Sequence, residues 1–304
     1  MSELKIYNFM GLRRIALVFS TVLLLISTGS LFSQGLVLGL DFSGGTQIEV
    51  GYERPVDVAE LRDQLKQSGF EDPVVVHFGS ESDVLIRMQG QPDQGLAERL
   101  YSVLQVSGEE IDLRRVDFVG PQIGEELRDK GGLGMLIALA VGMLDGASRF
   151  QWKVSGGAGL ARGHDVVITL GIFSITRLEF DLTVLAAVLA VVGYSLNDTI
   201  VVSDRIRENF RKIRKATAVE VINESLSQTL WRTINTSMTT MLVLLALFLF
   251  GGELIHNFAI ALMIGVGIGT YSSIYVAATV MLAMNVDRED LIEPEEGELV
   301  DDLP

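Results

Sequence analysis

Leu182–Val202 reads LTVLAAVLAVVGYSLNDTIVV, and Asp198 is its only charged side chain. An α-helix rises about 1.5 Å per residue, so about 20 apolar residues cross the hydrocarbon core of a bilayer. The stretch therefore predicts a membrane-spanning helix with a carboxyl group inside it. An ionised carboxylate in that position is costly unless it is paired or protonated, so Asp198 is predicted to titrate. The alternative is a structural partner in a hydrogen bond between helices.

Three further apolar runs have the length of a membrane span: Ile15–Phe32, Ile234–Phe250 and Phe258–Met284. The first could be a signal peptide, because the small residues Ser27–Ser30 lie near its end. No A-x-A cleavage site follows it and further spans do, so we expect an uncleaved first helix.

Two weaker runs, Leu133–Leu144 and Val154–Thr176, are limited or interrupted by charged residues, and hydropathy alone leaves them undecided. Basic residues decide the matter, because they collect on the cytoplasmic side of membrane proteins. The relevant ones are Arg13, Arg14, Arg149, Lys153 and the cluster between Arg205 and Lys215. They alternate correctly only if both weak runs span, which predicts six helices with both termini cytoplasmic.

The stretch between the first two spans alternates strands with helical patterns. Strands are expected near Gln47–Tyr52, Val74–Phe78, Val84–Met88 and Leu113–Val119. Apolar stripes at helical spacing separate them: Val58, Leu61, Leu65 in one, and Leu96, Leu100, Val103, Leu104 in the other. This order is the split ferredoxin-like motif, and the domain would face the periplasm. The predicted division is 1–35 for the N-terminus and first helix, 36–130 for the periplasmic α+β domain, 131–285 for a five-helix bundle, and 286–304 for an acidic cytoplasmic tail.

Charge is concentrated in two regions of this 304-residue chain, whose net charge is −15. Residues 41–130 hold 19 acids and 9 bases, and residues 287–302 hold 9 acids and 1 base. A nucleic-acid partner requires a basic face on a soluble domain, so that class is excluded. The chain has no cysteine, and its three histidines are far apart in sequence, so no metal or other cofactor is expected.

Four local patterns occur together in this chain. They are Leu40–Thr46 (LDFSGGT), Gly120–Gly124 (GPQIG), Gly193–Thr199 (GYSLNDT) with Asp204–Asn209 (DRIREN), and Arg232–Ser237 (RTINTS). In this order and on this topology, the chain resembles the SecD/SecF family of protein-export membrane proteins, within the resistance-nodulation-division superfamily. The resemblance covers nearly the whole chain.

The resemblance implies a proton-coupling site in the membrane. Asp198 would carry the proton, and Arg232 would be its cationic partner, although an arginine at a helix end can also reach toward the water at the membrane surface. Polar neighbours would supply a path for water or protons: Asn197, Thr199, Asn235 and Thr236, with Ser237, Thr239 and Thr240. For any one hydroxyl, a bond back to its own helix is the stronger alternative.

Other residues that match family positions have less specific roles. His164 and Asp165 form a second polar spot in the third span, with packing and a proton relay as equal possibilities. Asp41, Gly44 and Gly45 fall where the first span meets the periplasmic domain, and a glycine pair there permits a tight turn. We interpret these three as hinge residues without a catalytic role.

The chain departs from the family between Gly142 and Gly163. Relatives carry large apolar or aromatic residues near Gly142, Asp145, Gly146, Ser148, Gly159 and Arg162. Single T-to-G changes account for most of these exchanges, so sequencing error or recent decay is one hypothesis, which resequencing tests. If the residues are genuine, Asp145 and Arg162 lie on neighbouring antiparallel spans and could pair.

The resemblance implies no enzyme activity. It implies a subunit of an accessory complex of the Sec translocase, which uses the proton motive force to promote translocation of secreted proteins. The implied partners are SecD, the SecYEG channel, YajC and the unfolded secretory polypeptide. One alternative is a half-size proton-driven exporter of small molecules, but such exporters carry large soluble loops in both halves and Gly251–Asn257 is short. The other is a passive membrane scaffold, which would not need Asp198.

Overall fold

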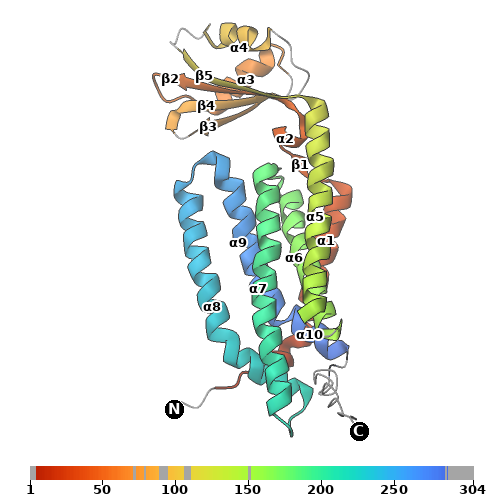
Figure 1. Ribbon diagram of the computed structural model, residues 1–304. Coiled ribbons are helices and arrows are strands. Elements are labelled where there is room, and N and C mark those ends of the chain that lie inside the picture. Colours follow the sequence, from red (N-terminus) through yellow and green to blue (C-terminus); the bar gives the residue numbers. More distant parts are fainter. Residues whose placement is uncertain are drawn as a thin grey trace, which may run out of the picture.

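A computed structural model describes residues 5–70, 73–78, 80–88, 95–105, 111–149, 152–284 and 286. The chain forms a long helical bundle with a small α/β domain at one end (Figure 1). Six helices in the described part are long and apolar enough to cross a membrane. The predicted acidic tail, 286–304, lies outside the described residues except for Val286.

The bundle begins with the 3-10 turn η1 (Phe9–Leu12). It consists of α1 (Arg13–Ser33), α5 (Pro121–Arg149), α6 (Trp152–Thr176), α7 (Leu182–Lys212), α8 (Ala218–Phe250), α9 (Glu253–Ile274) and the short α10 (Val276–Ala283). Both weak apolar runs are thus within spanning helices, which confirms the expectation of six spans. The sixth predicted span divides into α9 and α10 around Tyr275.

The domain between α1 and α5 has the predicted order of strands and helices. Its elements are β2 (Gly45–Tyr52), α3 (Val58–Gln67), β3 (Val74–Phe78), β4 (Ser80–Met88), α4 (Leu96–Gln105) and β5 (Ile111–Val119). The strands form an antiparallel sheet in the order β3-β4-β2-β5, as expected for a ferredoxin-like fold. Helices α3 and α4 cover the face of the sheet that is farther from the bundle (Figure 1).

Sequence patterns explain the core of this domain. Ile48, Val50 and Val84 are fully buried on the face that meets the helices, together with Leu65 and Leu100 from the two predicted stripes. Side chains alternate across a strand, so the neighbouring Gln47 and Arg87 point to the opposite face. The polar face of the sheet is therefore the one turned toward the bundle.

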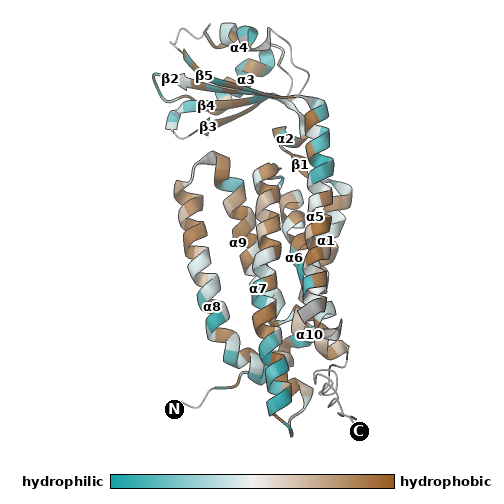
Figure 2. Ribbon diagram, viewed as in Figure 1, coloured by the Kyte–Doolittle hydropathy of each residue, from teal (hydrophilic) through white to brown (hydrophobic). Residues whose placement is uncertain are grey.

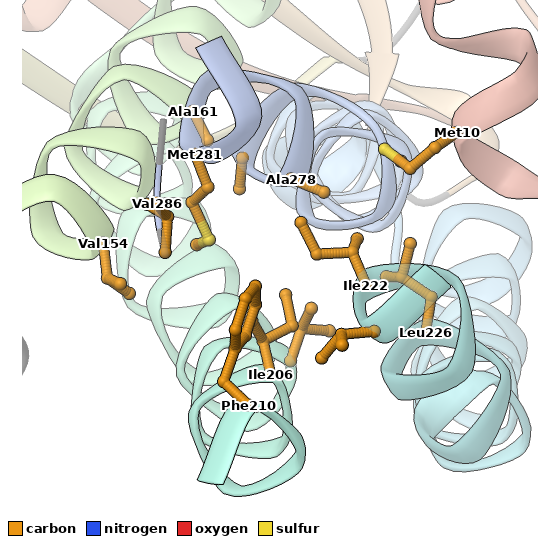
Figure 3. Close-up of a cluster of buried hydrophobic side chains, with 13 residues drawn as sticks. Met10, Val154, Ala161, Ile206, Phe210, Ile222, Leu226, Ala278, Met281 and Val286 are labelled. Atoms are coloured by element: carbon orange, nitrogen blue, oxygen red, sulfur yellow. The ribbon is translucent and has the colours of Figure 1, made fainter. Parts of the chain in front are cut away.

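Apolar residues predominate along the helices of the bundle, hydrophilic residues gather at the domain-side end of α5 and at the opposite end of α7, and the domain carries both kinds (Figure 2). One core cluster lies at the end far from the domain, where Met10, Ile206, Ile222 and Met281 bring η1, α7, α8 and α10 together (Figure 3). The N-terminal turn is held there by a bond from the Met10 amide to Asn223 Oδ1 at 2.9 Å.

Two short segments join the domain to the bundle. The strand β1 (Val37–Leu38) pairs in parallel with β6 (Glu179–Phe180), and α2 (Leu40–Ser43) follows β1 directly. Since β6 immediately precedes α7, the entry to the domain is fixed to the start of the helix that carries Asp198.

The α5–α6 hairpin contains the residues that depart from the family. The Arg162 side chain is 1% exposed, and its Nε donates to the Ala158 carbonyl at 3.0 Å. A Cβ on Gly142 would lie 2.6 Å from Arg162 Nη1, and one on Gly146 would lie 3.1 Å from Nη2. The two glycines thus provide the space that the guanidinium occupies. Asp145 lies within electrostatic range of Arg162, and their ion pair stays a prediction.

Candidate functional site

Asp198 lies near the middle of α7 and is buried, with 7% of its surface exposed. Ser273 Oγ, from α9, donates to Asp198 Oδ2 at 3.0 Å. The low exposure and the single short contact with Ser273 leave the charge of an ionised Asp198 only partly compensated by the described chain.

A second buried carboxyl group lies between the same helices. Asp165, on α6, is fully buried and accepts hydrogen bonds at Oδ2 from Ser195 Oγ at 2.6 Å and from Ser272 Oγ at 2.7 Å. His164 Nδ1 is 3.0 Å from the other carboxylate oxygen of Asp165. The two predicted polar spots in the membrane therefore meet at one place, the Ser272–Ser273 pair of α9.

Several buried polar atoms near these carboxyl groups lack a hydrogen-bond partner. In the described part of the chain they include Thr199 Oγ1 and Ser203 Oγ on α7, Thr233 Oγ1 on α8, and His164 Nε2 on α6. Buried polar groups are nearly always bonded to protein or to ordered water, so these atoms mark positions where water can bind.

Arg232 lies on α8, within electrostatic range of Asp198. The two described side chains do not form an ion pair within 4.0 Å, and Arg232 is exposed. With Asp204 and Glu208, Arg232 lines a cavity of about 210 Å³ between α7 and α8. The arginine thus faces a polar opening beside α7 instead of binding Asp198 directly.

The remaining predicted path residues divide into two groups. Thr236 Oγ1 donates to the Arg232 carbonyl at 2.9 Å, a bond back to its own helix, and Thr239 and Thr240 bond in the same way. Asn197 and Asn235 are exposed on the outer surface of the bundle. Of the predicted polar residues, Thr199 alone is buried beside Asp198 in α7, and Ser237 bonds to Tyr194 and Thr270.

The predicted hinge residue Asp41 contacts the start of α7. Its Oδ2 accepts a hydrogen bond from the Leu182 amide at 3.1 Å, beside the N-cap bond that Asp181 makes to the Val184 amide. A carboxylate at a helix N-terminus is stabilised by the free amides there. The adjacent Phe42 stacks on Phe180, with ring centroids 5.9 Å apart. Through these contacts, α2 is attached to α7.

Gly44 and Gly45 both adopt positive φ, at 72° and 139°, in the turn from α2 into β2. A Cβ on Gly44 would lie 2.8 Å from the Pro121 Cα, and a Cβ on Gly124 would lie 3.0 Å from the Gly44 backbone nitrogen. Two of the four sequence patterns therefore meet in space, and their glycines allow the backbones of the turn and of α5 to touch.

Comparison with known proteins identifies the group to which this architecture belongs. Residues 100–287 match the family described as protein export membrane protein SecD/SecF, C-terminal, and residues 29–56 match the SecD/SecF GG motif. The protein translocase subunit SecF of Pseudomonas aeruginosa is 52% identical over 98% of this chain and 97% of the relative. The chain belongs to the SecD/SecF family.

Other members of the SecD/SecF family agree with this placement. The SecF of Vibrio alginolyticus is 45% identical over 99% of the chain. The crystal structure of Thermus thermophilus SecDF, a translocon-associated membrane protein, superposes with a TM-score of 0.83 at 37% identity and covers 94% of this chain. This chain spans 40% of that longer SecDF chain.

A second contact between domain and bundle in this SecD/SecF chain was not predicted. Arg87, on β4, forms an ion pair with Glu179, on β6, at 2.5 Å, and Arg87 Nε donates to Gln47 at 2.9 Å. Burial raises the pKa of the Glu179 carboxyl above its usual range, although Arg87 opposes this effect. The desolvation of Glu179 therefore outweighs the attraction of its partner.

Sequence reasoning also missed the serines that bind the two carboxyl groups. Ser195, Ser272 and Ser273 are each fully buried in apolar helices, and each donates to Asp165 or Asp198. A pair of adjacent serines in an otherwise apolar span was the available signal. Ser195 lies within the GYSLNDT pattern, but its partner Asp165 follows only from the packing of α6 against α7.

Proposed function

We propose that this chain is the SecF subunit of an accessory complex of the Sec translocase, which couples proton movement to the translocation of secreted proteins. The observation that supports the proposal best is the buried pair Asp165 and Asp198, joined through adjacent serines of α9. Buried ionisable groups in membrane spans are costly and typically serve ion pathways. The proposed function is transport, with Asp198 as the proton carrier.

The surroundings of Asp198 support a route for the proton. The unbonded hydroxyls of Thr199 and Ser203 lie on α7, the helix of Asp198, and that of Thr233 lies on α8, in positions that water molecules would occupy. Arg232, next to Thr233 in α8, lines the cavity between α7 and α8. In the proposed mechanism, protonation of Asp198 changes its attraction to Arg232 and its bond to Ser273, and α7 and α9 adjust their packing.

A chain of contacts supports transmission of that change to the domain. Asp41 binds the first turn of α7, and the turn at Gly44 and Gly45 leads from α2 into β2, the strand between β4 and β5. A shift of α7 would therefore move the strand at the centre of the sheet. The proposed consequence is that the domain holds or releases an unfolded secretory polypeptide as Asp198 gains or loses its proton.

Exposed polar residues on the outer surface of α7 and α8 indicate that a second helical bundle binds there. Asn197, Arg232 and Asn235 are exposed there, on helices that are long and apolar enough to cross a membrane. Polar side chains in membrane spans are almost always turned toward protein or water, so a second protein is expected to cover them. SecD is the proposed partner, since the longer solved relative is named SecDF. The SecYEG channel and YajC are proposed as further partners of the complex.

We also propose that the chain lies in the bacterial inner membrane with the domain in the periplasm and both termini in the cytoplasm. Cysteine substitution tests this orientation, because the native chain has no cysteine. Ser80→Cys should react with a membrane-impermeant thiol reagent added outside spheroplasts. Lys215→Cys, exposed between α7 and α8, is the matched control and should react only after lysis. Ser203 is buried and would be unreactive from either side.

Reconstitution tests the function itself. The chain, purified in mild detergent together with SecD, is placed in vesicles that contain the channel, and translocation of a secretory protein is followed with and without an imposed proton gradient. Gradient-dependent stimulation that requires this chain supports the proposal. Export of small molecules without any effect on polypeptide would favour the half-size exporter, and stimulation without a gradient would favour the passive scaffold.

A further inference from the structure

A cavity of about 400 Å³ lies at the domain-side end of the bundle, a size typical of ligand pockets. Its walls come from four helices and from the segment that joins α1 to the domain. The lining is almost entirely apolar and includes Leu31, Leu36, Met135, Leu170, Phe180 and Leu185. No step of the proposed proton coupling uses this cavity.

Arg128 is the one charged residue that lines the cavity in the part of the chain that the structure describes. It lies on α5, one turn before Gly132 and two turns before Met135, which also line the cavity. Because a helix rises about 1.5 Å per residue, the arginine is about 6 Å nearer the domain than Gly132 and about 10 Å nearer than Met135. The charge is therefore at the outer end of an apolar pocket.

The position of Arg128 along α5 matches the level of lipid headgroups. Charged residues are frequent in α5 from Glu125 to Lys130, and the apolar part of the helix begins directly after them. Leu133, Leu136 and Ile137, in the following turns, are exposed on the helix surface, as expected for contact with acyl chains. The pocket thus begins at the polar boundary and continues into the apolar region.

Two carboxylates flank the arginine. Glu125 Oε1 is 3.6 Å from Arg128 Nη2, and Asp129 Oδ1 is 3.7 Å from Arg128 Nε. Both distances exceed that of a hydrogen bond, and all three side chains are about half exposed or more, so they remain open to further partners. One cation between two anions complements a headgroup that carries both a phosphate and an amine.

We propose that this pocket binds one zwitterionic phospholipid of the outer leaflet. Its phosphate would bind Arg128, its amine would bind Glu125 or Asp129, and one acyl chain would fill the apolar cavity past Gly132 and Met135. An acyl chain in this cavity would gain packing contacts with its apolar lining. The bound lipid would rest against Phe42 and Phe180, the stacked pair that joins α2 to the start of α7.

The glycines of α5 provide a matched test. A Cβ on Gly132 meets no atom within 4 Å, and the same holds for Gly134, which does not line the cavity. The first side-chain atom thus fits at both positions, and Gly132→Phe places a ring at the pocket while Gly134→Phe adds the same side chain elsewhere on the same helix. Met135→Trp is a second pocket-filling variant, used where thermal unfolding shows that Gly132→Phe is misfolded.

The full chain, with its partner subunit where the two purify together, is stripped of lipid and mixed with palmitoyl-oleoyl phosphatidylethanolamine or phosphatidylglycerol, and bound lipid is counted by native mass spectrometry. We expect one tightly bound phosphatidylethanolamine per chain, a loss of at least fivefold in Gly132→Phe, and no change in Gly134→Phe. Arg128→Gln should reduce the preference for phosphatidylethanolamine over phosphatidylglycerol to near one. Equal binding by the two phenylalanine variants would overturn the proposal, as would a partner helix cross-linked to Met135.

Discussion

Ser272 and Ser273 are neighbours in α9, yet their hydroxyls donate to different carboxylates, Ser272 to Asp165 at 2.7 Å and Ser273 to Asp198 at 3.0 Å. Asp165 belongs to α6 and Asp198 to α7, so one turn of α9 connects the two acidic positions of the membrane region. A change of protonation at either carboxyl group therefore alters a contact of the same short segment.

Loss of Ser273 should reduce gradient-dependent translocation more than loss of Ser272. Ser273→Ala removes the 3.0 Å hydrogen bond from Ser273 to Asp198, and such a bond to a charged group contributes roughly 1.5–3 kcal/mol. We expect a loss of roughly ten- to hundredfold in gradient-dependent translocation, measured in vesicles. Ser272→Ala is the matched control, since Asp165 keeps its bond to Ser195. A larger loss in Ser272→Ala would show that Asp165 is the more important acid.

The joint between domain and bundle should tolerate no side chain at Gly44. Gly44→Ala forces a side chain into a positive φ and to within 2.8 Å of the Pro121 backbone. Gly69 also has positive φ, 90°, but a Cβ there meets open space. Gly69→Ala should therefore cost about 1 kcal/mol of unfolding free energy, and Gly44→Ala clearly more. Thermal unfolding of both variants measures the difference, and equal losses would show that Gly44 needs only its backbone freedom.

Docking of the domain on the bundle should weaken as pH rises. Burial raises the pKa of Glu179, with Arg87 lowering it and Asp181 and Asp41 nearby raising it. A raised pKa means that the docked state favours the protonated acid. Docking is therefore fully favoured below the ordinary glutamate pKa and is lost as pH rises through the raised value. Spin labels at Ser80→Cys and Leu249→Cys, which line one cavity between domain and bundle, report the separation.

The control for this pH dependence is Glu179→Gln, which keeps the shape of the side chain and cannot titrate. The distance distribution between the two labels should then be independent of pH over the whole range in which the native protein responds. An unchanged pH response in Glu179→Gln would assign the effect to another group.

The stability cost of a larger side chain at Gly142 should depend on whether Arg162 is present. Gly142→Val places atoms where the guanidinium lies, and such overpacking typically costs roughly 1–3 kcal/mol. In an Arg162→Leu background the same change should cost much less, because the guanidinium is gone. A double-mutant cycle of melting temperatures in detergent gives the coupling. Gly134→Val, on the same helix and in open space, is the control. Additive changes in melting temperature would contradict the inference that Gly142 provides space for the Arg162 guanidinium.

The sequence predicted the fold because its signals were local. Span length, basic residues at helix ends and two apolar stripes specify six helices and a ferredoxin-like domain. The contacts of the site are not local: Asp165 meets Ser272 across 107 positions of the chain, and Arg87 meets Glu179 across 92. Such pairs depend on how helices rotate and pack, which hydropathy does not encode. For the same reason, the exposure of Asn197 and Asn235 could not be read from their motifs.

The central claim is that Asp198 carries the proton, and replacement by Asn and by Glu tests it most directly. Asn keeps the size and hydrogen-bonding capacity of Asp but cannot titrate, while Glu titrates and is one methylene longer. Both variants are purified with SecD, to show that they assemble, and translocation driven by the proton gradient is measured in vesicles. The account predicts that Asp198→Asn loses the gradient-dependent part while nucleotide-driven translocation persists, and that Asp198→Glu retains partial activity. Asn outperforming Glu would contradict the account, because a purely structural role tolerates the isosteric amide better than the larger acid.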